Sequence, residues 1–210
     1  MVVKYVVLVL CALSLLTSCR QSYHKPPSYF AKLIAASVRI SNASGGSGSG
    51  VWIGPNEILT AAHVVSDVTN LPSLFVTVLN FGQAQVQKFD AALDLAIIVL
   101  EHTTADYIEL ADIPGEIGEY CAQVGYAAGL YSPTITEGLV QCLDYHGFLR
   151  YSAPGIYGNS GGGIFVRRDD EWQLLSVCQR IQTINGGMPM THLMYGARTE
   201  DIRGFLSLGN

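Results

Sequence analysis

The stretch Gly158-Asn159-Ser160-Gly161-Gly162 decides how this chain is interpreted, because it places one serine among glycines. Glycine permits backbone conformations that a side chain would hinder, so the chain can turn sharply and present amide N–H groups beside the hydroxyl. A serine alone is a weak nucleophile at neutral pH, and it becomes reactive beside a general base that a third group orients. The stretch therefore predicts a nucleophilic serine, and it requires a histidine and a carboxylate elsewhere.

Both partners occur upstream, in the chain order histidine, aspartate, serine. His63 ends a Thr-Ala-Ala-His sequence after the apolar run 51–59, and Asp94 comes directly before the apolar residues 95–98. His63 would act as general base toward Ser160 and then as general acid toward the leaving amine. Asp94 would hold the correct histidine tautomer and stabilise the imidazolium, while the N–H groups of Gly158 and Ser160 would form an oxyanion hole.

Two carboxylates compete for the third position of this triad. Asp90 and Asp94 lie in one segment, but only Asp94 leads into an uninterrupted apolar stretch. A carboxylate in such surroundings needs an imidazole N–H as a partner to offset its desolvation. We therefore favour Asp94 and interpret Asp90 as a solvated residue at a strand end.

These segments resemble the chymotrypsin-fold serine peptidases, and among them the bacterial trypsin-like and HtrA-like branch. The resemblance rests on residues 48–65, 94–97 and 158–162, and it extends from about Ala36 to the C-terminus. It implies a serine endopeptidase that acts on a protein or peptide substrate through an acyl-enzyme, with no metal and no cofactor. One departure is Gly163, where proline is usual in the family.

The resemblance also implies an all-β fold of two six-stranded antiparallel β-barrels, with the active site between them and a C-terminal α-helix. Short β-type runs between turn residues support this fold. For the first barrel, about residues 30–105, we expect strands at 37–40, 50–53, 57–60, 74–79, 84–89 and 95–100. For the second, about residues 116–210, we expect strands at 122–124, 134–141, 162–166, 174–179 and 192–197, then a helix with Thr199 as N-cap.

The N-terminus has the features of an export signal. Lys4 precedes an apolar run at 6–16, which is shorter than the roughly 20 residues of a membrane span. The sequence Leu-Thr-Ser-Cys that ends at Cys19 resembles the lipobox of bacterial lipoproteins, so residues 1–18 would be removed and Cys19 would be lipidated. An ordinary cleaved signal peptide, with Cys19 incidental, is the alternative.

The segment after the signal, residues 19–29, contains two prolines and would be an extended tether. The protease domain would then span residues 30–210, and residues 30–36 fit either a short helix or the lead-in to the first strand. The protein would be exported and held at a bacterial membrane through lipidated Cys19, in the periplasm or at the cell surface.

Composition is consistent with this interpretation. The chain has 210 residues, 49% of them hydrophobic, which is enough to bury a substantial core. Its formal net charge is -5 and its lysines and arginines are scattered, so nucleic acid is not an expected partner. No group of cysteines and histidines has metal-ligand spacing. Cys121, Cys142 and Cys178 remain after export; a disulfide between Cys121 and Cys142 and three free thiols are both compatible with the sequence.

Specificity depends on the resemblance alone. It places Pro154 near the base of the primary pocket, and it makes Gln179, Arg180 and Ile181 the residues that pair with bound peptide. A pocket for small or medium apolar side chains is one expectation. Arg180 offers the other, because its charge would favour an acidic side chain. A pseudoprotease that binds a peptide without cleaving it is the rival to an enzyme.

Overall fold

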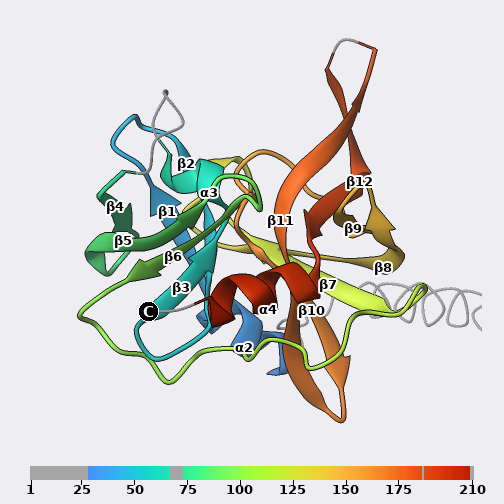
Figure 1. The fold of residues 1–210 in the computed structure, drawn as a ribbon, viewed down its shortest axis with the longest axis horizontal. Helices are drawn as coiled ribbons and strands as arrows, with labels where there is room; N and C mark the ends of the chain where they lie inside the picture. Colours follow the sequence, from blue (N-terminus) through green and yellow to red (C-terminus); the bar gives the residue numbers. More distant parts are fainter. Residues whose placement is uncertain (1–27, 67–72, 186, 209–210) are drawn as a thin grey trace, which may run out of the picture. The chain divides into compact units, whose positions relative to one another are not determined.

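The computed structural model describes residues 28–66, 73–185 and 187–208 (Figure 1). The chain divides into two units, Met1–Ala31 and Lys32–Asn210, and of the first only η1 (Ser28–Phe30) and Ala31 are described. The expected export signal, the lipidation of Cys19 and nearly all of the tether lie outside the described residues. Within the described ranges, no helix is long and apolar enough to cross a membrane.

The first barrel closes in the strand order β1-β2-β3-β6-β5-β4. Its strands are β1 (Ser37–Ser41), β2 (Ser47–Trp52), β3 (Glu57–Thr60), β4 (Phe75–Val78), β5 (Gly82–Asp90) and β6 (Leu95–Val99). The pleat sets the burial: in β4, Val76 and Val78 face the core while Phe75 and Thr77 are exposed. Trp52 is fully buried inside the barrel. All six expected strands are present, with ends within a few residues of those expected.

Two short helices accompany this barrel. Helix α2 (Ala31–Ala35) precedes β1, so a helix and not a strand lead-in occupies residues 30–36. Helix α3 (Ala62–Val65) follows β3 and carries His63.

The second barrel closes in the order β10-β11-β12-β9-β8-β7. Its strands are β7 (Tyr120–Gly125), β8 (Thr134–Tyr145), β9 (Phe148–Tyr151), β10 (Gly163–Arg168), β11 (Glu171–Ile184) and β12 (Met188–Ala197), with η2 (Ala127–Gly129) after β7. The sequence located only five of these strands and missed β9, whose four residues have no long apolar run. Pairing with β8 and β12 defines β9. In Figure 1 the far end of the β11–β12 hairpin extends away from the rest of the barrel. The expected fold is confirmed.

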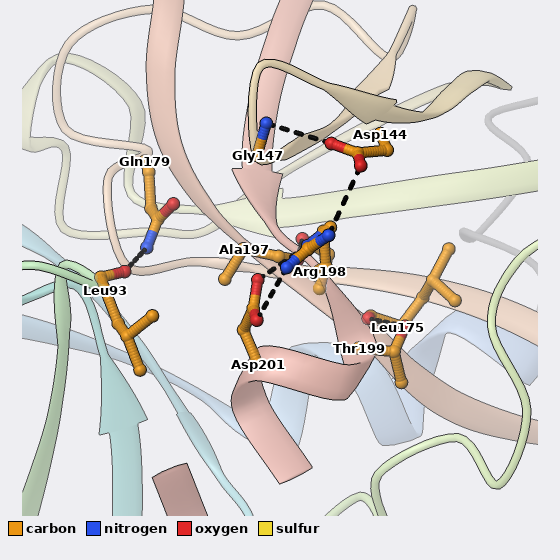
Figure 2. Close-up of polar contacts among 10 residues, drawn as sticks. Leu93, Asp144, Gly147, Leu175, Gln179, Ala197, Arg198, Thr199 and Asp201 are labelled. Atoms are coloured by element: carbon orange, nitrogen blue, oxygen red, sulfur yellow. Dashed lines mark hydrogen bonds and ion pairs between the residues drawn. The ribbon is translucent and has the colours of Figure 1, made fainter. Parts of the chain in front are cut away.

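Helix α4 (Thr199–Ser207) ends the described chain. Its N-cap is Arg198 rather than the expected Thr199, whose hydroxyl instead donates to the carbonyl of Leu175 at 2.8 Å (Figure 2). The guanidinium of Arg198 lies 2.7 Å from a carboxylate oxygen of Asp201 and 3.3 Å from one of Asp144. The hydrogen bond to Asp201 raises the pKa of Arg198 above its ordinary value.

The three cysteines of the described domain are free thiols. β7 pairs with β8, but Cys121 lies opposite Gly138 and not opposite Cys142, so the bridge does not form. Burial raises the pKa of Cys121 and of Cys178 from 9.0 to about 12, so both are neutral thiols at physiological pH. Cys142 is only partly buried.

Candidate active site

The first barrel brings His63 and Asp94 together. Nδ1 of His63 lies 2.9 Å from Oδ2 of Asp94 and 3.1 Å from Oδ1, and the backbone N–H of His63 donates to Oδ1 at 2.9 Å. An ionised carboxylate only accepts hydrogen bonds, so Nδ1 is the donor, and in the neutral imidazole Nε2 then has the lone pair. The carboxylate is 14% exposed and the imidazole 45% exposed. This arrangement leaves a basic nitrogen directed away from the aspartate.

Asp90 has a different role from Asp94. Its Oδ1 accepts the backbone N–H groups of Ala92 at 2.8 Å and Leu93 at 2.9 Å, which forms the turn after β5. Asp94, which lies just before β6, is therefore the carboxylate that meets His63.

The second barrel contributes Ser160 on the sharp turn before β10. Gly158 has φ of +95° and Gly161 has φ of +81°, a region that favours glycine. Side chains would also collide, because a Cβ at Gly158 would lie 2.4 Å from the carbonyl oxygen of Tyr126. At Gly161 a Cβ would lie 2.1 Å from the carbonyl oxygen of Ser49. The glycines that drew attention in the sequence are required by this turn.

The peptide groups on both sides of the turn have a fixed orientation. The carbonyl of Tyr157 accepts the N–H of Ala128 at 2.6 Å, and the carbonyl of Asn159 accepts the N–H of Gly162 at 2.8 Å. In a trans peptide the N–H points opposite to the carbonyl, so the N–H groups of Gly158 and Ser160 point away from these partners. Neither N–H donates a hydrogen bond to another described residue. Both are available to an oxyanion.

Ser49, from β2 of the first barrel, holds this turn. Its N–H donates to the carbonyl of Ser160 at 2.7 Å, and its hydroxyl donates to the carbonyl of Gly158 at 2.7 Å. The same hydroxyl accepts the N–H of Tyr126 at 2.8 Å, and the Ser49 carbonyl accepts the hydroxyl of Thr60 at 2.6 Å. Ser49 is completely buried. No local sequence pattern marks Ser49 as a functional residue, because its partners lie far away in the chain.

Gln179, from β11 of the second barrel, in turn holds a segment of the first barrel. Its Nε2 donates to the carbonyl of Leu93 at 2.7 Å and to that of Asp94 at 2.8 Å, and Figure 2 shows the side chain reaching toward Leu93. Asp94 has a positive φ of +54°, which is strained for a residue with a side chain, and these bonds hold its backbone.

One cavity of about 530 Å³ joins these elements. Its walls are Asn42, Gly46, Ser47, His63, Val64, Ile156, Tyr157, Gly158, Ser160, Cys178, Gln179, Arg180, Ile181 and Met194. His63 and Ser160 thus face one space, although no hydrogen bond joins their side chains in the described part of the chain. Catalytic hydrogen bonds are often long in a site without substrate and tighten when it binds.

The expected specificity residues divide into two groups. Gln179, Arg180 and Ile181 line the cavity, whereas Pro154 does not: it is exposed, and its carbonyl accepts the hydroxyl of Thr136 at 2.6 Å. In its place the cavity has Ile156 and Tyr157 from the segment before the nucleophile, and Met194 from β12. The pairing of β12 with β11 and with β9 brings Met194 here, so no local sequence signal could have identified it.

Comparison with known proteins decides the family. A family model described as a trypsin-like peptidase domain matches residues 48–177, which is more than half of the chain. The chain belongs to this trypsin-like peptidase family. Protease Do-like 4, a mitochondrial protein of Arabidopsis thaliana, is 32% identical over 149 residues, which cover 58% of this chain and 28% of the relative. The chain therefore spans less than a third of the length of that relative.

Solved structures share the fold of this chain. The serine endoprotease from Yersinia pestis matches with a TM-score of 0.71 at 22% identity, over 87% of this chain and 66% of the other. The active form of the Rv3671c protease from M. tuberculosis matches with a TM-score of 0.70 at 22% identity, over 85% and 82% of the two chains. The HtrA-type protease AlgW with a tripeptide matches with a TM-score of 0.70 at 19% identity, over 85% and 61%. The expected family is confirmed by the family model, and these structures show that the expected fold is shared.

Among the described residues, no group of three or more His, Cys, Asp or Glu side chains could hold a metal ion.

Proposed function

We propose that this trypsin-like peptidase is a serine endopeptidase whose catalytic groups are His63, Asp94 and Ser160. The observation that carries the proposal is the pair of hydrogen bonds from His63 to the Asp94 carboxylate, in a cavity that Ser160 also lines. A histidine held in this tautomer can accept a proton at Nε2, which a serine nucleophile requires.

The proposed reaction has two halves. Oγ of Ser160 attacks the scissile carbonyl carbon while Nε2 of His63 takes the hydroxyl proton, and the resulting oxyanion accepts the N–H groups of Gly158 and Ser160. His63 then protonates the leaving amine as the C–N bond breaks, which leaves an acyl group on Ser160. A water molecule attacks the acyl carbon, His63 takes its proton, and the acid product leaves with the Ser160 hydroxyl restored.

An open strand edge supports binding of peptide in this cavity. β10 pairs with β11 as far as Val177, and the Cys178 N–H donates to the Gly162 carbonyl at 2.8 Å. From there to Ile184, β11 pairs only with β12 among the described strands. We therefore assign residues 179–181 as the edge to which an extended substrate adds as an antiparallel strand.

The alternative is a binding protein that holds a peptide in the same cavity without cleaving it. The observation in its favour is the lack of a hydrogen bond between the described side chains of His63 and Ser160. A fluorophosphonate probe separates the two proposals, because it modifies only an activated serine. We expect one covalent adduct, located on Ser160 by mass spectrometry and lost in Ser160→Ala and His63→Ala. A folded protein that remains unlabelled would favour the binding protein.

We further propose that the protein is exported and anchored through acyl chains on Cys19. The support is the signal-like sequence that ends at Cys19, since several acyl chains bind a membrane stably where one does not. Intact-mass analysis of the membrane fraction should find a mature chain that begins at Cys19 with added lipid mass. Cys19→Ser should leave the uncleaved precursor. A soluble chain that begins after Cys19 would support an ordinary signal peptide.

A further inference from the structure

One charged side chain on the wall of the active-site cavity has no charged partner. Arg180 is exposed, and in the described part of the chain its guanidinium makes no ion pair and no hydrogen bond. It is instead held over the ring of Phe148, with 4.4 Å from Cζ to the ring centroid. Stacking of this kind orients a guanidinium and leaves the N–H donors at its edge free.

Three other arginines of the second barrel have acidic partners, whereas Arg150 makes no ion pair among the described residues and lies over the ring of Tyr145, with 5.0 Å from Cζ to the ring centroid. Arg168 lies 2.8 Å from Glu119, Arg167 lies 3.3 Å from Asp170, and Arg198 bonds to Asp201. The chain has 17 acidic residues against 12 lysines and arginines, so acidic partners are in excess. Arg180 differs from Arg150 because it is exposed and lines the active-site cavity, whereas Arg150 is partly buried and does not line that cavity.

Arg180 also connects two cavities. Besides the active-site cavity, it lines a smaller one of about 180 Å³. The other residues of the smaller cavity are Tyr145, His146, Phe148, Gln182 and Tyr195. Neither cavity has an aspartate or glutamate among the described residues that line it. The carboxylate of Asp144, which directly precedes Tyr145 in the sequence, is bound to Arg198 and to the N–H of Gly147.

The backbone explains how Arg180 comes to this position. The register of β11 against β12 shifts between Cys178 and Arg180, where β11 leaves its pairing with β10. Irregularities of this type re-aim a side chain and occur beside active sites. Arg180 thus lies on the open strand edge that begins beside Ser160.

We propose that Arg180, stacked on Phe148, forms a subsite that binds a carboxylate of the substrate. The peptidase then selects peptides that carry an aspartate or glutamate within a few residues of the cleaved bond. This proposal rests on the proposed function, because it places the substrate along the edge at residues 179–181. The carboxylate can belong to a side chain or to the C-terminus of the peptide, and the guanidinium recognises both by the same paired hydrogen bonds.

Binding to the Ser160→Ala protein tests this proposal independently of turnover. The probes are arrayed octapeptides with no other charge, in matched pairs that differ only by glutamate or glutamine, each with a C-terminal amide or a free acid. We expect glutamate to increase affinity by about three- to tenfold over glutamine, since the pair is partly exposed. Raising the salt concentration to about 0.5 M should weaken this preference. Preference only for the free C-terminal acid would assign the carboxylate to the C-terminus.

Two further variants and a control make the test decisive. In the Ser160→Ala background, Arg180→Gln should abolish the preference for glutamate, and Arg180→Glu should reverse it toward lysine peptides. Arg167→Gln, which changes an arginine already paired with Asp170, should preserve it. Equal binding of glutamate and glutamine peptides, or a preference that survives Arg180→Gln, would overturn the proposal. Labelling of Ser160 by a fluorophosphonate reports separately on the proposed function, so the two can fail independently.

Discussion

The two barrels contribute different halves of the candidate active site, and each half is held by a residue of the other barrel. The first barrel carries His63 and Asp94, whose backbone is held by Gln179 from the second. The second barrel carries Ser160, whose turn is held by Ser49 from the first. The geometry of each half therefore depends on how the barrels pack together.

The hydrogen bonds of Ser49 and those of Gln179 differ in how many polar groups of the residue they satisfy. Ser49 uses its N–H, its hydroxyl and its carbonyl, and every one of these groups has a partner. Gln179 uses both hydrogens of its amide, but its buried Oε1 has no partner among the described residues. A buried oxygen without a hydrogen bond costs stability, which offsets part of what the amide contributes. The turn of Ser160 is thus held more firmly than that of Asp94, and variants can rank the two.

The largest effect should come from the residues that the barrels bring together. Ser160→Ala and His63→Ala should each lower kcat by about 10⁶-fold, and the double variant should be no worse, because the groups act as a unit. Steady-state kinetics on a peptide substrate measures this. Additive losses would show that the two barrels act independently.

The next effect concerns the carboxylate of the first barrel. Asp94→Asn should lower kcat by about 10⁴-fold, because the amide favours the wrong histidine tautomer. Asp90→Asn is the matched control, and it should retain nearly full kcat. If Asp90→Asn were the damaging change, the assignment of the carboxylate would be wrong.

Ser49→Ala should lower kcat by about 10²-fold with little change in KM. The substitution frees the carbonyl of Gly158, which belongs to the peptide group between the two that carry the oxyanion-hole N–H groups. Both N–H groups are then held less firmly, and one such donor is worth about 10²–10³-fold in kcat. Ser176→Ala is the control, since Ser176 is also completely buried and donates to the carbonyl of Ala197 at 2.7 Å away from the cavity. Equal losses of kcat in both variants would show that Ser49 acts only by stabilising the fold.

Gln179→Leu should have a smaller effect, about tenfold in kcat, because the bonds from His63 to Asp94 remain and only the backbone of Asp94 loosens. Gln173→Leu, at the other end of β11, is the control and should leave kcat unchanged. Kinetics of both variants at one pH suffice. If kcat fell further in Gln179→Leu than in Ser49→Ala, the hydrogen bonds of Gln179 would matter more for catalysis than those of Ser49, which is the reverse of what we expect.

The smallest expected effects concern the buried thiols of the second barrel, through their reactivity and their contribution to the pH dependence of stability. Cys121 and Cys178 have a raised pKa of about 12, so of the three described cysteines iodoacetamide should modify only Cys142 in the folded protein. Above pH 9 the unfolded chain loses these thiol protons while the folded chain keeps them, so stability should fall as pH rises toward 12. Denaturant melts from pH 8 to 10.5 check the sign, and Cys178→Ala should reduce the slope.

Much of the fold could be predicted because its signals are local. Apolar runs between turn residues gave eleven strands, and the glycines around Ser160 indicated a turn that the backbone requires. β9 could not be predicted, since its existence depends on pairing with β8 and β12. Thr199 was a wrong N-cap because its hydroxyl has a tertiary partner, Leu175, that local sequence does not reveal.

The residues of the candidate site also divide into those that a local sequence pattern indicates and those that depend on tertiary contacts. His63, Asp94 and Ser160 stand in sequence patterns that indicate their chemistry, and the structure brings His63 to Asp94. Ser49 was visible only as a small residue between glycines, because its partners lie in the other barrel. Met194 reaches the cavity through a strand pairing of long sequence separation, which no motif reports.

The central claim is that a serine of the second barrel, activated by a histidine of the first, attacks the substrate. Rapid mixing with a peptide p-nitrophenyl ester, followed by acid quench and intact-mass analysis, tests it directly. We expect a burst of about one nitrophenol per protein molecule. We also expect an acyl adduct on Ser160 that is absent in Ser160→Ala and His63→Ala. Product release without a burst or adduct, or an adduct on another residue, would contradict the account.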